Sequence, residues 1–133
     1  MMQKEVAERI CAKPGNKSYG SLTLLIQYFA EPKILFRVPK DSFSPVPKVD
    51  SAFVAFEVRR KSANFANVNL FKRLIKAAFQ QRRKKVINAF VHAGIDQQDI
   101  LKVFKKLNYN SNLRAENLDF QNYLDITNSL KMI

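Results

Sequence analysis

Apolar residues stand at every second position in two short segments of the first half of the chain. These segments, residues 33–38 and 51–58, have the two-residue period that is typical of a strand with one buried face. Two other segments, residues 5–12 and 21–29, have the spacing of short helices, and Ser21 is the expected cap of the second. The apolar run after Ser21 fits a buried strand nearly as well.

Apolar residues recur at helical spacing in the second half of the chain. Asn69 is expected to cap a helix that continues through the charged run at residues 82–85 and stops at Gly94. Asp96 and Asp119 are expected to cap two further helices. Strands followed by helices predict an α+β chain.

Between the two halves the sequence loses both periods. Residues 61–68 consist mainly of Ser, Asn and Ala, which is typical of a connecting segment. We therefore expect a first piece at residues 1–60, a linker at 61–68 and a helical subdomain at 69–133.

The charge of the chain is strongly basic and unevenly spread. Its 133 residues include 23 Lys and Arg against 11 Asp and Glu, a net charge of +12. Residues 70–106 alone carry 10 basic and 2 acidic residues. Such an excess favours a polyanionic partner, because neutralising phosphates releases condensed counterions. Binding to a membrane surface is the rival interpretation of the same charge.

Several classes of site are excluded by residue counts. Cys11 is the single cysteine and His92 the single histidine, so an internal disulfide, a zinc quartet or a His-based metal cluster is not expected. The longest apolar stretch, residues 22–30, is too short to span a bilayer. The first residues lack the apolar core of a secretory signal, and we expect a cytoplasmic protein.

A proline-rich loop lies between the two predicted strands and reads FSPVPKVDS from Phe43 to Ser51. Prolines restrict the backbone, so an aromatic ring on this loop can be held in place. Phe43 could present its ring to a ligand or pack into the core beneath the loop. The residues alone leave both interpretations open.

Two further segments combine charge with helical or turn-forming residues. Gln80 to Lys85 reads QQRRKK, and its four consecutive charges interrupt the apolar stripe. A solvated face is the plainer interpretation, and an RNA-binding surface is the alternative. In the second segment, Leu113 to Leu118, Arg114 stands alone among neutral and acidic residues. By itself that segment indicates little.

Together these segments resemble the small-subunit rRNA adenine dimethyltransferases. Phe43 to Ser51 is similar to that family's F-x-P-x-P-K-V-D-S motif, Phe79 to Ala89 to its F-x-Q-R-R-K…N signature, and Arg114 to Leu118 to its R-A-E-N-L. Residues 3–7 and 19–22 match as well, so the resemblance covers essentially the whole chain. The second and third motifs resemble the ribosome-assembly branch rather than the macrolide-resistance rRNA methylases.

The resemblance implies roles for individual side chains. In the family, the aromatic residue at the position of Phe43 stacks on the flipped-out target adenine, a contact worth roughly 1–3 kcal/mol per base. The residues expected to bind RNA, from the charged run and the resemblance, are Arg82, Arg83, Lys84, Lys85, Arg114 and Lys48. Lys48 could instead only brace the loop.

The methyl-donor site of the family has no counterpart in this sequence. The family binds S-adenosylmethionine with a Gly-rich turn and holds the target amine with an N-L-P-Y motif. Here Gly15, Gly20 and Gly94 form no G-x-G turn, and the N-L-P-Y motif is missing. We therefore expect a fragment that begins inside the methyltransferase domain, binds no cofactor and is inactive alone.

The resemblance thus implies a partial edge of a Rossmann-like methyltransferase domain followed by an all-α RNA-binding subdomain. The parent enzyme would use S-adenosylmethionine to dimethylate paired adenines of small-subunit rRNA. Its expected partners are that rRNA and the assembling small ribosomal subunit, with no metal and no membrane, and it is expected to be a monomer. The alternatives are a non-catalytic basic RNA-binding or ribosome-assembly module and a membrane-surface protein.

Overall fold

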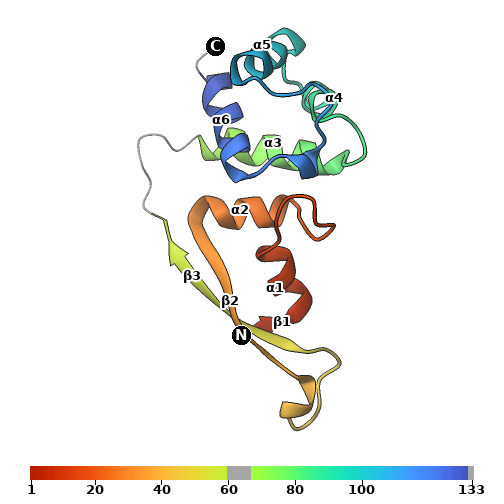
Figure 1. Cartoon of the computed structure of the whole chain (residues 1–133), viewed down its shortest axis with the longest axis vertical. Helices are drawn as coiled ribbons and strands as arrows, with labels where there is room; N and C mark the ends of the chain where they lie inside the picture. The colour runs from red at the N-terminus through yellow and green to blue at the C-terminus, as the bar shows by residue number, and fades with distance from the viewer. Residues whose placement is uncertain (60–66, 132–133) are drawn as a thin grey trace. The chain divides into compact units, whose positions relative to one another are not determined.

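The computed structural model describes residues 1–59 and 67–131 and divides into two compact units (Figure 1). Unit 1 is Met1–Arg59 and unit 2 is Arg60–Ile133, and each is described here by itself. The linker predicted at 61–68 lies outside the described residues, except for Asn67 and Val68.

Unit 1 contains a three-stranded antiparallel sheet with the order β1-β3-β2. The strands are β1 (Met2–Gln3), β2 (Ala30–Val38) and β3 (Ser51–Val58). The bounds predicted for β3 are confirmed, whereas β2 begins three residues earlier than the predicted segment 33–38 and includes Pro32. Proline is tolerated there because β2 is the outer strand of this sheet.

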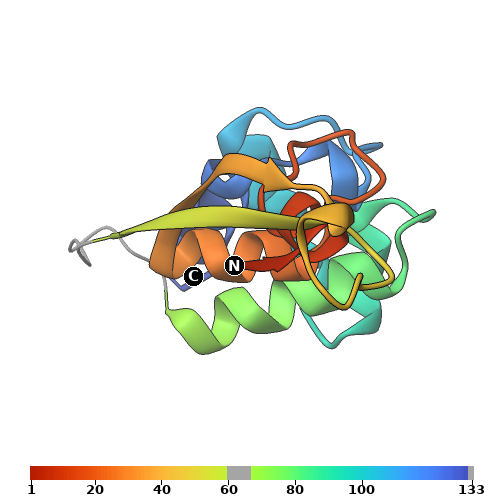
Figure 2. The same ribbon diagram turned by 90° about the horizontal axis from the view of Figure 1, so that it is seen from below.

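Two helices pack against the sheet of unit 1, namely α1 (Lys4–Ile10) and α2 (Ser21–Phe29). Helix α1 contacts all three strands, and α2 contacts both α1 and β2 (Figures 1 and 2). The segment that fitted a helix or a strand is therefore helical.

Gly20, and not the predicted Ser21, precedes the first turn of α2 as its N-cap. The buried Thr23 hydroxyl accepts a hydrogen bond from the Gly20 N–H at 3.2 Å and donates one to the carbonyl oxygen of Arg9. This second bond reaches the end of α1, so Thr23 joins the two helices of the unit.

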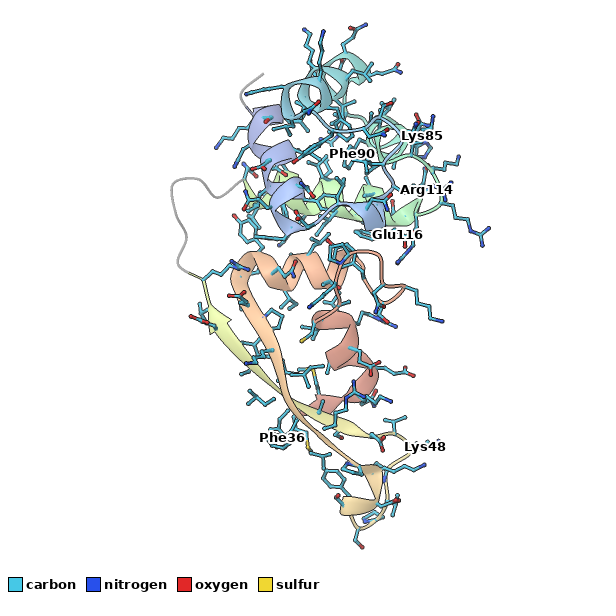
Figure 3. All side chains as sticks on the ribbon, in the orientation of Figure 1. Phe36, Lys48, Lys85, Phe90, Arg114 and Glu116 are labelled. Carbon is cyan, nitrogen blue, oxygen red and sulfur yellow. The ribbon has the colours of Figure 1, made fainter. Side chains whose placement is uncertain are left out.

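One face of the sheet carries large apolar side chains that remain open to solvent. Ala52 is 1% exposed, and strand alternation places its neighbour Phe53 on the opposite face. The rings of Phe53 and Phe36 lie there with centroids 4.8 Å apart, and the two residues are 38% and 54% exposed (Figure 3).

The regular elements of the described part of unit 2 are helices, as predicted, apart from one isolated β-bridge. Its elements are α3 (Val68–Gln80), α4 (Val86–His92), α5 (Gln97–Leu107), the short 3-10 helix η2 (Ala115–Asn117) and α6 (Phe120–Lys131). Each of the four α-helices contributes buried apolar residues to one core: Phe71, Leu74, Phe90, Ile100, Val103, Tyr123 and Ile126. Phe90 on α4 is fully buried in it (Figure 3).

The helix caps of unit 2 agree with the sequence prediction in two of three cases. The Asp96 carboxylate accepts from Asp99 N at 3.1 Å, and that of Asp119 accepts from Asn122 N at 2.7 Å, as expected of N-caps. The predicted cap Asn69 is wrong. The side chain of Asn67 accepts from the backbone N–H groups of both Asn69 and Leu70 instead.

The predicted continuous helix up to Gly94 is also wrong, because α3 ends at Gln80 and α4 begins only at Val86. The charged run lies in the turn between them. The predicted stop at Gly94 is confirmed, since this residue follows α4 with a φ of +98°, a conformation that favours glycine.

Candidate nucleic-acid interface

The turn between α3 and α4 is fixed by a segment far away in the sequence. Lys85 pairs with Arg114 in an isolated antiparallel β-bridge, and the N–H of Val86 donates to the carbonyl oxygen of Leu113 at 2.8 Å. The FQQRRKK and RAENL segments are thus neighbours in the fold. Lys85 and Arg114 lie on the same side of unit 2 (Figure 3).

Arg82 is directed at the protein rather than at solvent. Its Nη2 lies 3.3 Å from Oε2 of Glu116, and its guanidinium carbon lies 5.7 Å from the centroid of the Phe79 ring. About a third of each charged side chain of this ion pair is exposed, 33% for Arg82 and 35% for Glu116. The guanidinium thus has both a carboxylate and an aromatic partner.

The other four basic residues of the two segments are exposed, namely Arg83, Lys84, Lys85 and Arg114. Three of them follow one another in the turn, and the bridge places the fourth beside Lys85. Flexible cations gathered on one surface suit a partner with many phosphates, whose backbone they can contact without reading sequence.

The backbone that carries Arg114 is held by three hydrogen bonds. The Asn117 side chain accepts from the Arg114 N–H at 2.9 Å, and the Asn117 N–H donates to the Arg114 carbonyl at 3.0 Å. One residue further on, the buried Tyr123 hydroxyl donates to the carbonyl oxygen of Ala115 at 2.7 Å. Arg114 is therefore an exposed side chain on a restrained backbone.

The second candidate site is the proline-rich loop of unit 1. Phe43 is partly buried and directly follows the 3-10 helix η1 (Lys40–Ser42). Asp50 stabilises the base of the loop through two hydrogen bonds. Its carboxylate accepts one from the Lys40 N–H at 2.8 Å, and its carbonyl oxygen accepts one from the Lys4 N–H at 2.9 Å. The Ser44–Pro45 peptide bond in this loop is cis.

Lys48 is exposed on the same loop (Figure 3). It lines a hollow whose other residues are Lys4, Glu5, Lys40, Val49 and Asp50. The hydrogen bonds that hold the loop come from Asp50. Lys48 contributes a positive charge to the rim of the hollow.

Sequence reasoning found the exposed cations but missed the residues that hold them. Glu116 and Asp50 lie inside the recognised motifs, yet no signal in the sequence showed that their carboxylates bind Arg82 and the backbone of Lys40. The ion pair joins residues 34 positions apart, so only the fold brings its partners together.

The described part of the chain has neither a membrane-spanning helix nor a metal-binding group. No helix among residues 1–59 and 67–131 is long and apolar enough to cross a membrane. Over the same residues, no group of three or more His, Cys, Asp or Glu side chains is arranged to hold a metal ion.

The sequence matches the family described as ribosomal RNA adenine dimethylase over residues 1–132. It is 38% identical to the ribosomal RNA small subunit methyltransferase A of Fusobacterium nucleatum, over 95% of this chain and 48% of that protein. It is 42% identical to the protein of the same name from Buchnera aphidicola subsp. Acyrthosiphon pisum, over 98% of this chain and 46% of that protein. The chain therefore spans about half the length of these relatives.

Solved structures show the same fold. A crystal structure of a dimethyladenosine transferase from Plasmodium falciparum aligns with a TM-score of 0.77 and 25% identity, over 93% of this chain and 53% of that one. The 23S rRNA methyltransferase ErmE aligns with a TM-score of 0.66 and 16% identity, over 97% and 52%. The predicted fold class, a partial edge of a Rossmann-like methyltransferase domain followed by helices, is thereby confirmed.

Proposed function

The chain belongs to the ribosomal RNA adenine dimethylase family, and we propose that it supplies the rRNA-binding part of an S-adenosylmethionine-dependent adenine dimethyltransferase. The whole enzyme would dimethylate paired adenines of small-subunit rRNA during assembly of the small ribosomal subunit. It would act in the cytoplasm as a monomer. The names of the relatives support rRNA as the substrate class.

The observation that carries this proposal is a cluster of exposed cations on unit 2. It consists of Arg83, Lys84 and Lys85 in one turn and Arg114 on the segment that the β-bridge joins to that turn. Their exposure leaves them available to phosphates, and the fixed backbone limits the entropy lost when they bind. Contacts of this kind recognise the shape of a folded RNA more than its sequence. Lys48 would add a contact from the loop of unit 1.

Phe43 would form one wall of the pocket for the target adenine. A base must leave its stack before a methyl donor can reach its exocyclic amine, and an aromatic ring can hold it there. Hydrogen bonds of Asp50 hold the loop that carries Phe43, so the ring is attached to a restrained backbone. The amine would attack the donor methyl directly, and the protein would supply orientation and electrostatics.

The methyl donor itself would be bound by residues that this chain does not contain. None of the three glycines lies in a G-x-G turn, and no N-L-P-Y motif is present. The chain alone would therefore bind rRNA without transferring methyl groups. A non-catalytic RNA-binding or assembly module is the alternative function.

Binding of the chain to a small-subunit rRNA fragment, compared with anionic liposomes at equal salt, tests this proposal. We expect submicromolar to micromolar RNA binding and much weaker liposome binding. Charge reversal of Lys84 and Lys85 to Glu should abolish the RNA signal. Preferential binding to liposomes would contradict the proposal and favour a membrane-surface protein.

A further inference from the structure

Arg82 differs from the other basic residues of its turn in what surrounds it. Arg83, Lys84 and Lys85 are exposed, whereas Arg82 already binds a carboxylate and lies over an aromatic ring. A phosphate that bound the Arg82 guanidinium would have to displace the Glu116 carboxylate. It would then lie beside the unpaired negative charge of Glu116. Arg82 is thus poorly placed to be a phosphate ligand in this conformation.

The ion pair joins the same two segments as the β-bridge. Arg82 precedes the bridging residue Lys85 by three positions, and Glu116 follows the bridging residue Arg114 by two. Two chain segments held at two points keep a more fixed spacing than segments held at one. The spacing in question is the one between the exposed cations.

We propose that Arg82 and Glu116 are positioning residues, which hold the Arg83–Lys85 turn against Arg114 so that the four exposed cations match a folded RNA. This inference rests on the proposed function. It assigns to Glu116 a favourable effect on RNA binding, although its charge has the same sign as the phosphates. It also removes Arg82 from the set of direct RNA contacts.

The Glu116→Gln variant separates this account from simple electrostatics. The substitution makes the chain more basic by one charge, so charge alone predicts tighter RNA binding and a steeper salt dependence. Loss of positioning predicts weaker binding, by roughly two- to five-fold, with an unchanged salt slope. The matched control is Asp125→Asn on α6, which removes one negative charge outside the ion pair and should leave binding equal or slightly tighter.

The second variant is the charge swap, Arg82→Glu combined with Glu116→Arg. If Arg82 acts through Glu116, the swap should recover most of the affinity that Arg82→Glu loses alone. If Arg82 contacts phosphate, the swap should recover only the affinity that its two restored charges supply, and Arg82→Glu with Asp125→Arg, which has the same net charge, should bind equally well. Thermal melts of all variants should agree closely, since partly exposed ion pairs contribute little to stability.

Hydrogen exchange gives a readout that does not depend on RNA. The Val86 N–H, which donates to Leu113, should exchange faster in Glu116→Gln and return to its original rate in the swap. Tighter RNA binding by Glu116→Gln, or an unchanged Val86 rate, would overturn the inference while the proposed function stands. Absence of RNA binding by the unsubstituted chain would instead overturn the proposed function.

Discussion

At the scale of single residues, Phe43 could act by packing, by stacking on a base, or by both, because it is only partly buried. The loop beneath it is held by Asp50 and by the hydrogen bond from the Phe43 N–H to Lys40 O at 3.2 Å. Backbone groups therefore hold the loop at these points, and the stacking role of the Phe43 ring stays a prediction.

In the proposed full-length methyltransferase, Phe43→Ala should lower the rate of methyl transfer far more than it lowers the melting temperature. A single-turnover assay and a thermal melt on the same preparation compare the two effects. If the ring serves the core, the order reverses. Unfolding would then become easier by roughly 3–5 kcal/mol, as for other emptied Phe sites.

Cys11 offers a second test at the residue scale. Burial raises the pKa of the Cys11 thiol, and the backbone hydrogen bond with Ile34 offsets this only in part. Because the thiolate is the reactive form, a raised pKa means less thiolate near neutral pH. Alkylation by iodoacetamide at pH 8, followed by mass spectrometry, should be slower in the native chain than in urea. Equal rates would show that the site is open and its pKa ordinary.

At the scale of elements, the structure and the sequence prediction assign different N-caps to α3, Asn67 and Asn69. Asn67→Ala should destabilise unit 2 by about 1 kcal/mol, because two N–H groups of the first turn lose their acceptor. Asn69→Ala is the matched control and should have little effect. A denaturant titration followed by circular dichroism measures both. A larger loss for Asn69→Ala would contradict the assigned cap.

Local patterns predicted some elements well and others poorly. The alternation of Ser51–Val58 and the caps Asp96 and Asp119 are properties of neighbouring residues, and they were predicted correctly. The break between α3 and α4 was not, since a run of charges fits a helix as well as a turn. The break is fixed by partners about 30 positions away, the Lys85–Arg114 bridge and the ion pair of Arg82.

The candidate site shows the same division. Its exposed cations could be predicted because motif resemblance and charge both indicated them. The contacts of Arg82 with Glu116 and Phe79 could not, because the charged run and the resemblance gave Arg82 the same expected role as Arg83. The resemblance gave both positions the same expected role, and the fold shows that Arg82 is ion-paired whereas Arg83 is exposed. The positioning role of Arg82 is our proposal.

At the scale of the whole molecule, the chain spans about half the length of its relatives. The exposed Phe36 and Phe53 on one sheet face fit a partial domain.

We expect that isothermal titration with S-adenosylmethionine gives no binding to this chain and that no methyl transfer to RNA is detectable. Micromolar binding would show a donor site that the sequence does not reveal.

The central claim is that the exposed cations of unit 2 bind RNA through its phosphates. The most direct measurement is the slope of log affinity against log salt for the chain and for the Arg83→Ala, Lys84→Ala double variant. Each lost phosphate contact should reduce the magnitude of the slope by about 0.7–0.9, so the slope of the double variant should be smaller by about 1.4–1.8. The affinity of the double variant should fall by a similar factor for all related RNAs. The fold should survive, because exposed charges contribute little to stability. Unchanged affinity and slope in the double variant would show that the cluster is only a solvated surface.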